Sequence, residues 1–295
     1  MRKNGRYKKL TRAVRWIVLR ILSFCRDIQW KLGYQWNPFV DTVCPKIDSF
    51  RIRQQLETLG ITVHSIRVNL QEYATYVKAA HYPEDYYGGG LYPGCNFEEK
   101  ALEHFMSIKC LEITSSDIVL DVAALHSPFS DIVKQLYGCV AYKLDQTYAP
   151  GVHGTTIGGD AVTVPLPDNS VSKLVLHCSF EHFENDRDII FMKEANRLLC
   201  TNGRLCILPV HFGHSDFFLT DPCMDHRGIR WMRGEKVIYI RNFRNRYARF
   251  YSPHTFKKRI IGAMDKLSLK MFYLENNEEV GTATNLKFIA LFEKH

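Results

Sequence analysis

Three features are missing from the sequence: an internal repeat, a low-complexity tract and any pair of cysteines spaced as C-x-x-C. The first two absences exclude solenoid, fibrous and disordered chains, so a hydrophobic content of 46% in 295 residues indicates a globular core. The nine cysteines are odd in number and scattered, many of them within apolar runs. This usage is typical of buried thiols in a reducing cytosol, and the sequence predicts no metal site.

Residues 1–31 also lack an uncharged run of the roughly 20 residues that a membrane span needs, because Arg15, Arg20 and Arg26 interrupt the apolar segment. Arg20 and the lack of a small-residue cleavage site disfavour a signal peptide. The segment has ten Lys or Arg and a single acid, Asp27, whereas the rest of the chain has 29 bases and 30 acids. We therefore expect residues 1–31 to form a basic arm that binds anionic partners, and we expect no nucleic-acid-binding domain.

The apolar residues of residues 1–35 recur at alternating steps of four and three, which predicts a basic amphipathic helix. They are Leu10, Val14, Ile17, Ile21, Phe24 and Ile28. Three interpretations stay open: the helix lies on an anionic membrane surface, packs on the protein's own core, or pairs with a second copy to form an oligomer. The first predicts a cytoplasmic protein that is peripheral on the inner membrane face.

Residues 36–112 read as a mainly helical lead-in. Helices are expected at residues 49–59, 69–80 and 97–111, with a short strand within residues 61–68. Tyrosines beside Gly88, Gly89 and Gly90 fit either a lid over a pocket or a packed surface loop.

From residue 113 onward, buried apolar strands alternate with helices. The strands are expected at residues 117–123, 139–144, 155–159, 172–178 and 204–210, and the helices at residues 127–137, capped by Ser127, and 186–199. This alternation predicts an α/β fold, a three-layer sandwich around a Rossmann-like parallel sheet.

Four acids stand at or just after the carboxyl ends of predicted strands, namely Asp121, Asp145, Asp160 and Glu181. Ligands of parallel sheets bind at this edge, near the point where the strand order reverses. An acid after the second strand can accept hydrogen bonds from two ribose hydroxyls, and one after the third can meet the amine of adenine. The four acids together predict a nucleotide-like ligand.

Four motifs flank these strands. They are Gly159-Asp160-Ala161 with Pro165 to Val171, Phe180-Glu181-His182-Phe183, Glu194 to Leu205, and Arg249 to Phe256. Together they resemble the class I S-adenosylmethionine-dependent methyltransferases, and among these most closely the bacterial members found with surface-glycan biosynthesis enzymes. The resemblance covers about residues 113–210 and 248–295. It implies a mostly parallel seven-stranded sheet with a C-terminal antiparallel hairpin, and an insert at about residues 212–248.

The resemblance also implies which residues bind S-adenosylmethionine. Asp121 stands at the acid of the family's first motif, Asp145 would hold the ribose, and Asp160 with Ala161 would face adenine. His177 is expected beside the cofactor as well. The family's glycine-rich turn is replaced by Ala123 and Ala124, the next smallest residues. The altered turn keeps open an alternative, a non-catalytic methyltransferase-like binding subunit.

Methyl transfer requires removal of the acceptor's proton, for which histidine is suited at neutral pH. His182 and His211 follow the fourth and fifth predicted strands and are the expected catalytic residues, with His177 and His214 next, and Asp216 able to orient one of them. Arginines among aromatics in residues 212–248 suit a sugar or glycolipid acceptor. The sequence thus predicts O-methylation of a glycan or glycolipid precursor near a membrane. A nicotinamide-dependent oxidoreductase is disfavoured because no G-x-G-x-x-G follows the first strand.

Overall fold

The computed structural model describes residues 40–41, 45–87, 97–221, 224–231, 236–240, 243–281 and 285–295. The predicted basic helix of residues 1–35 and the glycines of the predicted lid lie outside these ranges. No helix of the described part is long and apolar enough to cross a membrane. The chain divides into two compact units: residues 47–215 with 251–295, and residues 216–250 with the segment before residue 47.

The larger unit is built on a sheet with the strand order β2-β11-β12-β7-β6-β3-β4-β5. These strands are β2 (Val63–Ile66), β3 (Ile118–Val122), β4 (Val140–His153), β5 (Thr156–Gly158), β6 (Val171–His177), β7 (Leu199–Leu208), β11 (Leu267–Leu274) and β12 (Phe288–Lys294). The strands from β3 to β7 are parallel, while β12 runs antiparallel to both β7 and β11. The predicted α/β class, with a mostly parallel sheet and a C-terminal antiparallel hairpin, is confirmed. Among the described residues the sheet has eight strands instead of seven, because β2 of the lead-in pairs in parallel with β11.

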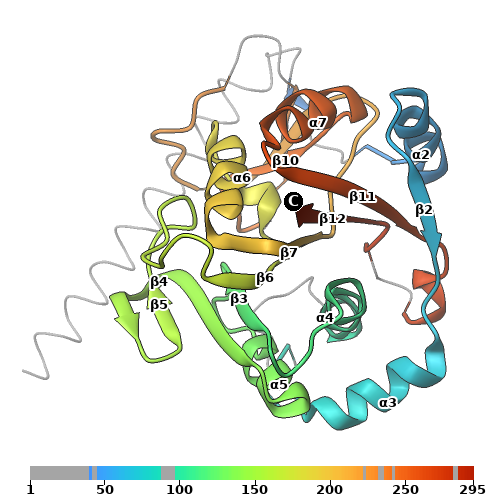
Figure 1. Ribbon diagram of the computed structural model, residues 1–295. Helices are drawn as coiled ribbons and strands as arrows, with labels where there is room; N and C mark the ends of the chain where they lie inside the picture. The colour runs from blue at the N-terminus through green and yellow to red at the C-terminus, as the bar shows by residue number, and fades with distance from the viewer. Residues whose placement is uncertain are drawn as a thin grey trace, which may run out of the picture. The chain divides into compact units, whose positions relative to one another are not determined.

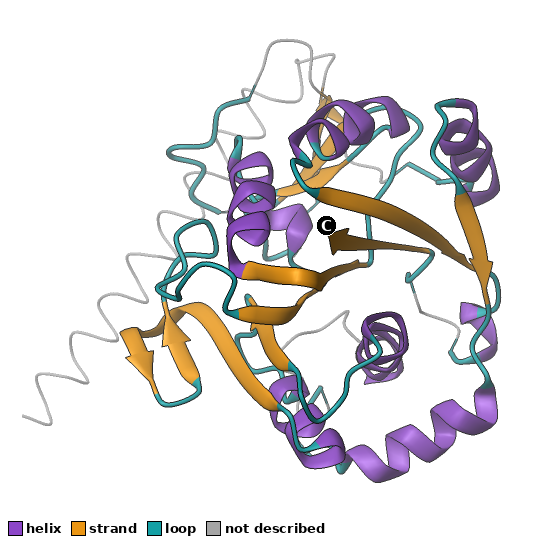
Figure 2. Cartoon of the chain, in the orientation of Figure 1, coloured by secondary structure: helices purple, strands orange, loops and turns teal. Residues whose placement is uncertain are grey.

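Helices cover both faces of this sheet (Figure 1). They are α2 (Ser49–Thr58), α3 (Leu70–Ala80), α4 (Phe97–Leu111), α5 (Phe129–Tyr137), α6 (Arg187–Leu198) and α7 (Pro253–Arg259). One apolar core joins α2, α6 and α7 to one face, and a second joins α3, α4 and α5 to the other (Figure 2). Burial on both faces explains why the central strands are continuous apolar runs, and it gives the three layers of the predicted sandwich.

Local capping signals fix where several helices begin. The side chains of Asp48, Asn69 and Ser252 accept hydrogen bonds from backbone N–H groups of the first turns of α2, α3 and α7. Ser127 was expected to cap α5, but Pro128 holds that position. The Ser127 hydroxyl instead accepts a hydrogen bond from the Phe129 N–H at 3.2 Å.

The second parallel strand is longer than predicted, since β4 continues to His153 instead of ending at Leu144. It pairs with β5 first through residues 143–145 and, after an irregularity, again through residues 150–153. Gly158 makes this arrangement possible, because a Cβ at that position would overlap the backbone of Ala149. The segment after Asp145 therefore folds back onto β5.

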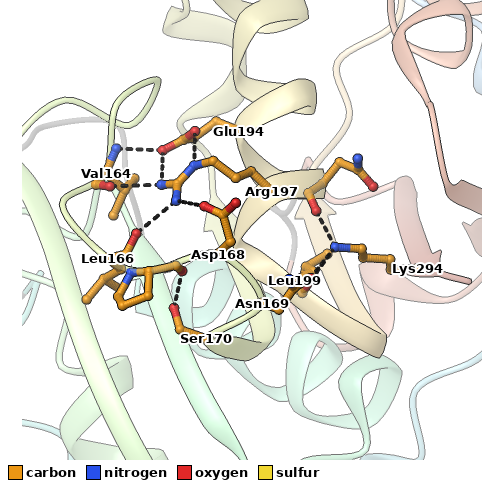
Figure 3. Close-up of polar contacts among 11 residues, drawn as sticks. Val164, Leu166, Asp168, Asn169, Ser170, Glu194, Arg197, Leu199 and Lys294 are labelled. Carbon is orange, nitrogen blue, oxygen red and sulfur yellow. Dashed lines mark hydrogen bonds and ion pairs between the residues drawn. The ribbon is translucent and has the colours of Figure 1, made fainter.

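The motif of residues 159–171 is tied to α6 by Arg197 (Figure 3). The Arg197 guanidinium donates to the carbonyl oxygens of Val164 and Leu166 at 3.0 and 2.9 Å, and to Asp168 at 2.6 Å. Glu194 accepts from Arg197 at 2.7 Å and from the Val164 N–H at 2.7 Å. Because backbone groups of the loop are satisfied by these two side chains, the loop has a defined path between β5 and β6.

We expect Arg197→Ala to lower the free energy of unfolding by about 2–4 kcal/mol, since it removes several charge-assisted hydrogen bonds to partly buried groups. The matched control is Arg51→Ala on the exposed face of α2, which should change the free energy of unfolding by less than about 0.5 kcal/mol. Urea denaturation measures both. Equal effects of the two substitutions would show that the loop does not depend on Arg197.

The smaller unit contains a sheet with the strand order β1-β9-β8-β10. Its strands are β1 (Val40–Asp41), β8 (Phe217–Thr220), β9 (Lys236–Tyr239) and β10 (Ala248–Phe250). The Arg249 guanidinium lies 5.4 Å from the ring centre of Phe218 and 5.7 Å from that of Tyr247, and Trp231 stacks on Tyr247 at 5.6 Å. An aromatic and arginine cluster thus forms within this unit.

Candidate active site

The predicted site residues lie at the carboxyl ends of β3 and β6, in the segments that follow β3, β5, β6 and β7, and within β4, where Asp145 is the last residue before the irregularity in its pairing with β5. The strand order reverses between β3 and β6, because the chain proceeds from β3 outward to β4 and β5 and then returns to β6. This is the place where open parallel sheets bind their ligands.

The turn after β3 keeps a backbone shape that normally requires glycine. Ala123 and Leu125 have φ values of 57° and 45°, in the left-handed region. Ala124 between them is buried, and its N–H donates to the Leu144 carbonyl at 2.9 Å. Two non-glycine residues of this turn therefore adopt a left-handed backbone conformation, which carries strain.

We expect Ala123→Gly to raise the free energy of unfolding by about 0.5–1 kcal/mol. Relief of the left-handed strain contributes about 1–2 kcal/mol, and the extra freedom of glycine in the unfolded chain offsets part of it. Ala124→Gly in the same turn is the matched control, and it should lower the free energy of unfolding by about 0.5–1 kcal/mol. If urea denaturation shows that both variants are destabilised to the same extent, the left-handed conformation of Ala123 does not cost free energy in the folded protein.

Asp145, at the end of the predicted second strand, holds this turn in place. One carboxylate oxygen accepts from the Leu125 N–H at 3.0 Å, and the other accepts from the N–H and hydroxyl of Thr147 at 2.8 and 2.7 Å. The Tyr148 hydroxyl donates to the Leu125 carbonyl on the same side. The Asp145 carboxylate is thus fixed beside the turn.

Asp160 lies in the loop after β5 and is less enclosed. Its side chain is 41% exposed, forms an ion pair with Arg187, and accepts from the Val162 N–H at 3.1 Å. Ala161 follows it and packs partly buried against the apolar core. The pair therefore places a partly exposed carboxylate and a small apolar side chain in this loop, and its contact with adenine stays a prediction.

Asp121 and His177 meet at the ends of β3 and β6. The Asp121 Oδ1 and the His177 Nδ1 are 3.4 Å apart, and both side chains are buried. Burial, together with the charge of Asp145, raises the pKa of Asp121 to about 8. Burial lowers the pKa of His177 well below its usual value. At neutral pH the carboxyl group therefore holds its proton for much of the time, and the imidazole is neutral.

Two buried polar atoms at this point lack a hydrogen-bond partner among the described residues, the Asp121 Oδ2 and the His177 Nδ1. The His177 Nε2 lies 3.0 Å from the Ser107 hydroxyl, which donates to the His104 carbonyl at 2.8 Å. Since that hydroxyl proton is committed, His177 must carry its proton on Nε2 and present an acceptor at Nδ1. Orphaned atoms of this kind indicate that a polar ligand completes the site.

A second cluster surrounds Glu181, in the 3₁₀ turn Phe180–His182 that follows β6. The Oε1 of Glu181 accepts from the Cys178 Sγ at 3.3 Å. The Nε2 atoms of His211 and His182 lie 3.5 and 3.6 Å from the same oxygen. The structure thus brings together the two histidines that sequence reasoning selected, with Glu181 between them.

Charge coupling shifts the titration of this cluster. Burial alone would raise the pKa of Glu181, but His182 and His211 more than offset it and hold that pKa far below the usual range. Burial alone would lower the pKa of His211, but Glu181 raises it above its usual value. The buried Glu181 carboxylate therefore stabilises the protonated form of His211 relative to a free imidazole.

The described contact of His214 lies away from this cluster. The Nε2 of His214 accepts from the Asp48 N–H at 3.2 Å, at the exposed start of α2. Asp216 belongs to the smaller unit. The orientation of a histidine by Asp216 stays a prediction.

Sequence reasoning missed the polar side of α4. All of its residues from Glu99 to Leu111 except Lys109 are buried. The Lys100 Nζ donates to both carboxylate oxygens of Glu103, at 3.1 and 2.9 Å. Burial raises the pKa of Glu103 to about 7, although Lys100 acts against it. The signal in the sequence was an apolar stripe, which locates the core-facing residues but does not reveal that polar residues of the same helix are enclosed as well.

Comparisons with known proteins agree with this picture. The family model described as "Methyltransferase domain" matches residues 120–207, which include most of β3, all of β4, β5 and β6, and most of β7. A search of curated proteins gives no match.

Solved structures with some likeness include the 1,6-didemethyltoxoflavin-N1-methyltransferase of Burkholderia thailandensis, with bound S-adenosylhomocysteine. It is 13% identical over 76% of this chain and 89% of that protein, with a TM-score of 0.46. A methyltransferase of Methanosarcina mazei is 15% identical over 62% of this chain and 94% of that protein, with a TM-score of 0.38. A protein from an antibiotic biosynthesis pathway of Anabaena variabilis is 20% identical over 35% of this chain and only 43% of its own length, with a TM-score of 0.30. All three TM-scores lie below 0.5, and nothing about this chain is inferred from them.

The residues present fit S-adenosylmethionine. The orphaned Asp121 oxygen is an acceptor that suits an ammonium group, the Asp145 carboxylate suits hydroxyls, and the partly exposed Asp160 suits an exocyclic amine. Sheet topology, the acids at its edge and the matched domain agree. The methyltransferase domain matched at residues 120–207, on a mostly parallel sheet of this topology, indicates an S-adenosylmethionine-dependent methyltransferase enzyme.

Proposed function

We propose that the enzyme methylates an oxygen or nitrogen of its acceptor, and that His211 with Glu181 removes the acceptor's proton. The observation that carries this proposal is the buried Glu181 carboxylate, 3.5 Å from the His211 Nε2. A hydrogen bond from the Nε2–H to Glu181 favours the tautomer in which Nδ1 holds the accepting lone pair. The carboxylate then stabilises the imidazolium that forms when the proton is taken.

The cofactor, when bound, supplies a methyl group on an already activated sulfonium. The chain's own residues then have two tasks, to align the acceptor and to accept its proton. Asp121, Asp145 and Asp160 with Ala161 are proposed to hold the cofactor, and Ala123 and Ala124 to let it approach the backbone. His177 is proposed to orient Asp121, and His182 to share the charge of Glu181 with His211.

The test is an acceptor screen with methyl-labelled S-adenosylmethionine, using the full chain and its Glu181→Gln variant. We expect at least one acceptor to be labelled by the wild-type chain and labelled far more slowly by the variant. Equal labelling by both proteins would overturn the role of Glu181.

We further propose that the acceptor is a glycan or glycolipid precursor. The support is the exposed Arg227 and Arg230 next to the half-buried Trp231 in the sequence of the smaller unit, because aromatic faces and guanidinium groups bind sugar rings and their phosphates. Sugar-phosphate and lipid-linked sugar precursors are therefore the first acceptors to screen. Labelling of non-sugar acceptors alone would contradict this choice.

The basic arm is proposed to hold the enzyme at an anionic membrane surface. Residues 1–31 carry ten bases and one acid, and each base near such a surface contributes up to about 1 kcal/mol. We expect deletion of residues 1–31 to abolish cosedimentation with vesicles that contain phosphatidylglycerol, and to leave cofactor affinity within about twofold. Neutral phosphatidylcholine vesicles are the control. If the truncated chain sediments with the anionic vesicles as well as the full chain does, the arm is not the anchor.

A further inference from the structure

The environment of Cys178 is not explained by proton transfer. This residue follows β6 with φ at 47°, a strained conformation for any residue other than glycine. The strain accompanies a direct contact, since the Cys178 Sγ lies 3.3 Å from the Glu181 Oε1. A thiol is therefore held beside a carboxylate and an imidazole at the carboxyl edge of the sheet.

The three groups have the spacing of metal ligands. One ligand atom from each of Cys178, Glu181 and His211 lies within 4.8 Å of the other two. Tetrahedral Zn²⁺, with bonds of about 2.0–2.3 Å to nitrogen, oxygen and sulfur, places its ligand atoms about 3.3–3.6 Å apart. The observed separations from Glu181 are 3.3 Å to the thiol and 3.5 Å to the imidazole. Two of the three separations therefore match those of tetrahedral Zn²⁺ ligands, and the third is within 4.8 Å.

The charges also suit a divalent ion. A thiolate and a carboxylate together balance a charge of +2, so the buried site would be neutral when occupied. Cysteine sulfur and imidazole nitrogen are the ligands that Zn²⁺ prefers, whereas Mg²⁺ and Ca²⁺ prefer oxygen alone. Three protein ligands leave one coordination position for water or another small ligand.

We propose that Cys178, Glu181 and His211 bind Zn²⁺, and that the bound ion prevents His211 from accepting the acceptor's proton. On binding, the Cys178 thiol and the Nε2 of the His211 imidazolium each release one proton to solvent. The sulfur and the Nε2 lone pair then bind the metal, and the remaining His211 proton stays on Nδ1. The inhibition rests on the proposed function of His211 as the proton acceptor, whereas the binding of Zn²⁺ does not.

Binding is tested with Co²⁺, whose bond to a thiolate gives a charge-transfer absorption band. The full chain is stripped with a chelator, titrated with Co²⁺ and then with Zn²⁺. We expect one Co²⁺ per chain with a thiolate band, displaced by one equivalent of Zn²⁺. Cys178→Ser should abolish the band and His211→Gln should weaken binding at least tenfold. Cys200→Ser, which removes a thiol outside the cluster, should retain both the thiolate band and the wild-type affinity for Co²⁺.

A wild-type chain that gives no band with stoichiometric Co²⁺ overturns the site, as does a band that survives in Cys178→Ser. The wild-type chain also provides a readout that needs no variant to fold. Zn²⁺ should slow alkylation of Cys178 at least tenfold, measured by peptide mass spectrometry, and should leave Cys200 unchanged. Equal alkylation rates at Cys178 with and without Zn²⁺ contradict the proposal.

Inhibition is measured separately from binding, so that a failure of the metal site can be distinguished from a failure of the proposed role of His211. Stoichiometric Zn²⁺ should lower methyl transfer at least tenfold in the wild-type chain and in Cys200→Ser, and a chelator should restore it. Zn²⁺ binding without inhibition would keep the site and overturn His211 as the proton acceptor. Methyl transfer without any Zn²⁺ binding would overturn the site alone.

Discussion

Replacing Glu181 with glutamine is expected to slow methyl transfer by about 10²- to 10⁴-fold, with cofactor affinity changed by less than about threefold. Glutamine keeps the shape of the side chain but removes the charge that stabilises the His211 imidazolium at 3.5 Å. Single-turnover transfer from labelled cofactor measures the rate. Glu278→Gln, at an exposed ion pair with Lys287, is the matched control and should leave the rate unchanged.

His211→Gln should slow transfer by at least about 10²-fold, and His182→Gln by less than His211→Gln does. Both histidines lie near the same Glu181 oxygen, but the side chain of His182 is 34% exposed and that of His211 is 18% exposed. Melting temperature and cofactor affinity are measured on the same variants, because loss of a packing histidine acts mainly through stability. If neither variant slows transfer tenfold, the proton acceptor lies elsewhere.

The pH dependence of the rate provides an independent check on the pair. Glu181 raises the pKa of His211 above 6.5, and only the deprotonated imidazole can accept a proton. The wild-type rate should therefore fall as the pH decreases through that raised pKa. Removing the carboxylate in Glu181→Gln lowers the pKa of His211, so the acid limb of the profile should move to lower pH while the maximum rate drops. An unshifted limb would show that the pair does not set the profile.

Asp145→Ala is expected to weaken binding of S-adenosylmethionine by about 10- to 150-fold, which corresponds to about 1.5–3 kcal/mol for a hydrogen-bonded charged group. The variant also loses the brace on the turn at Leu125, so its melting temperature should fall. Asp160→Ala should weaken binding with a smaller change in stability, because its side chain is 41% exposed. Calorimetric titration measures the affinities. Wild-type affinity in both folded variants would contradict the assignment of the cofactor site.

Local signals in the sequence were sufficient for most of the larger unit. The predicted helix at residues 97–111 coincides with α4, and the predicted strand at residues 172–178 matches β6 to within one residue. Capping residues and apolar periodicity act over a few neighbours, and such signals can be read directly. The pairing of β2 with β11 joins residues about 200 positions apart, and no local pattern specifies it. The return of β4 onto β5 likewise depends on the close approach at Gly158.

The site shows the same division between local and long-range information. Strand-end positions selected Asp121, Glu181 and His211, because the carboxyl ends of parallel strands share one edge. That Glu181 and His211 face each other could not be predicted, since they are 30 positions apart on different strand ends. Cys178 was interpreted as a buried thiol, and its contact with Glu181 depends on a left-handed residue that sequence patterns do not reveal.

The most direct test of the central claim is calorimetric titration of the full chain with S-adenosylhomocysteine, alongside Asp145→Ala. The structure predicts saturable binding at one site per chain, weakened at least tenfold in the folded variant. The turn at Ala123 and Leu125 and the acids at the sheet edge give the chain the groups that this binding needs. A folded wild-type chain that shows no binding would contradict the account and would favour a non-catalytic methyltransferase-like subunit.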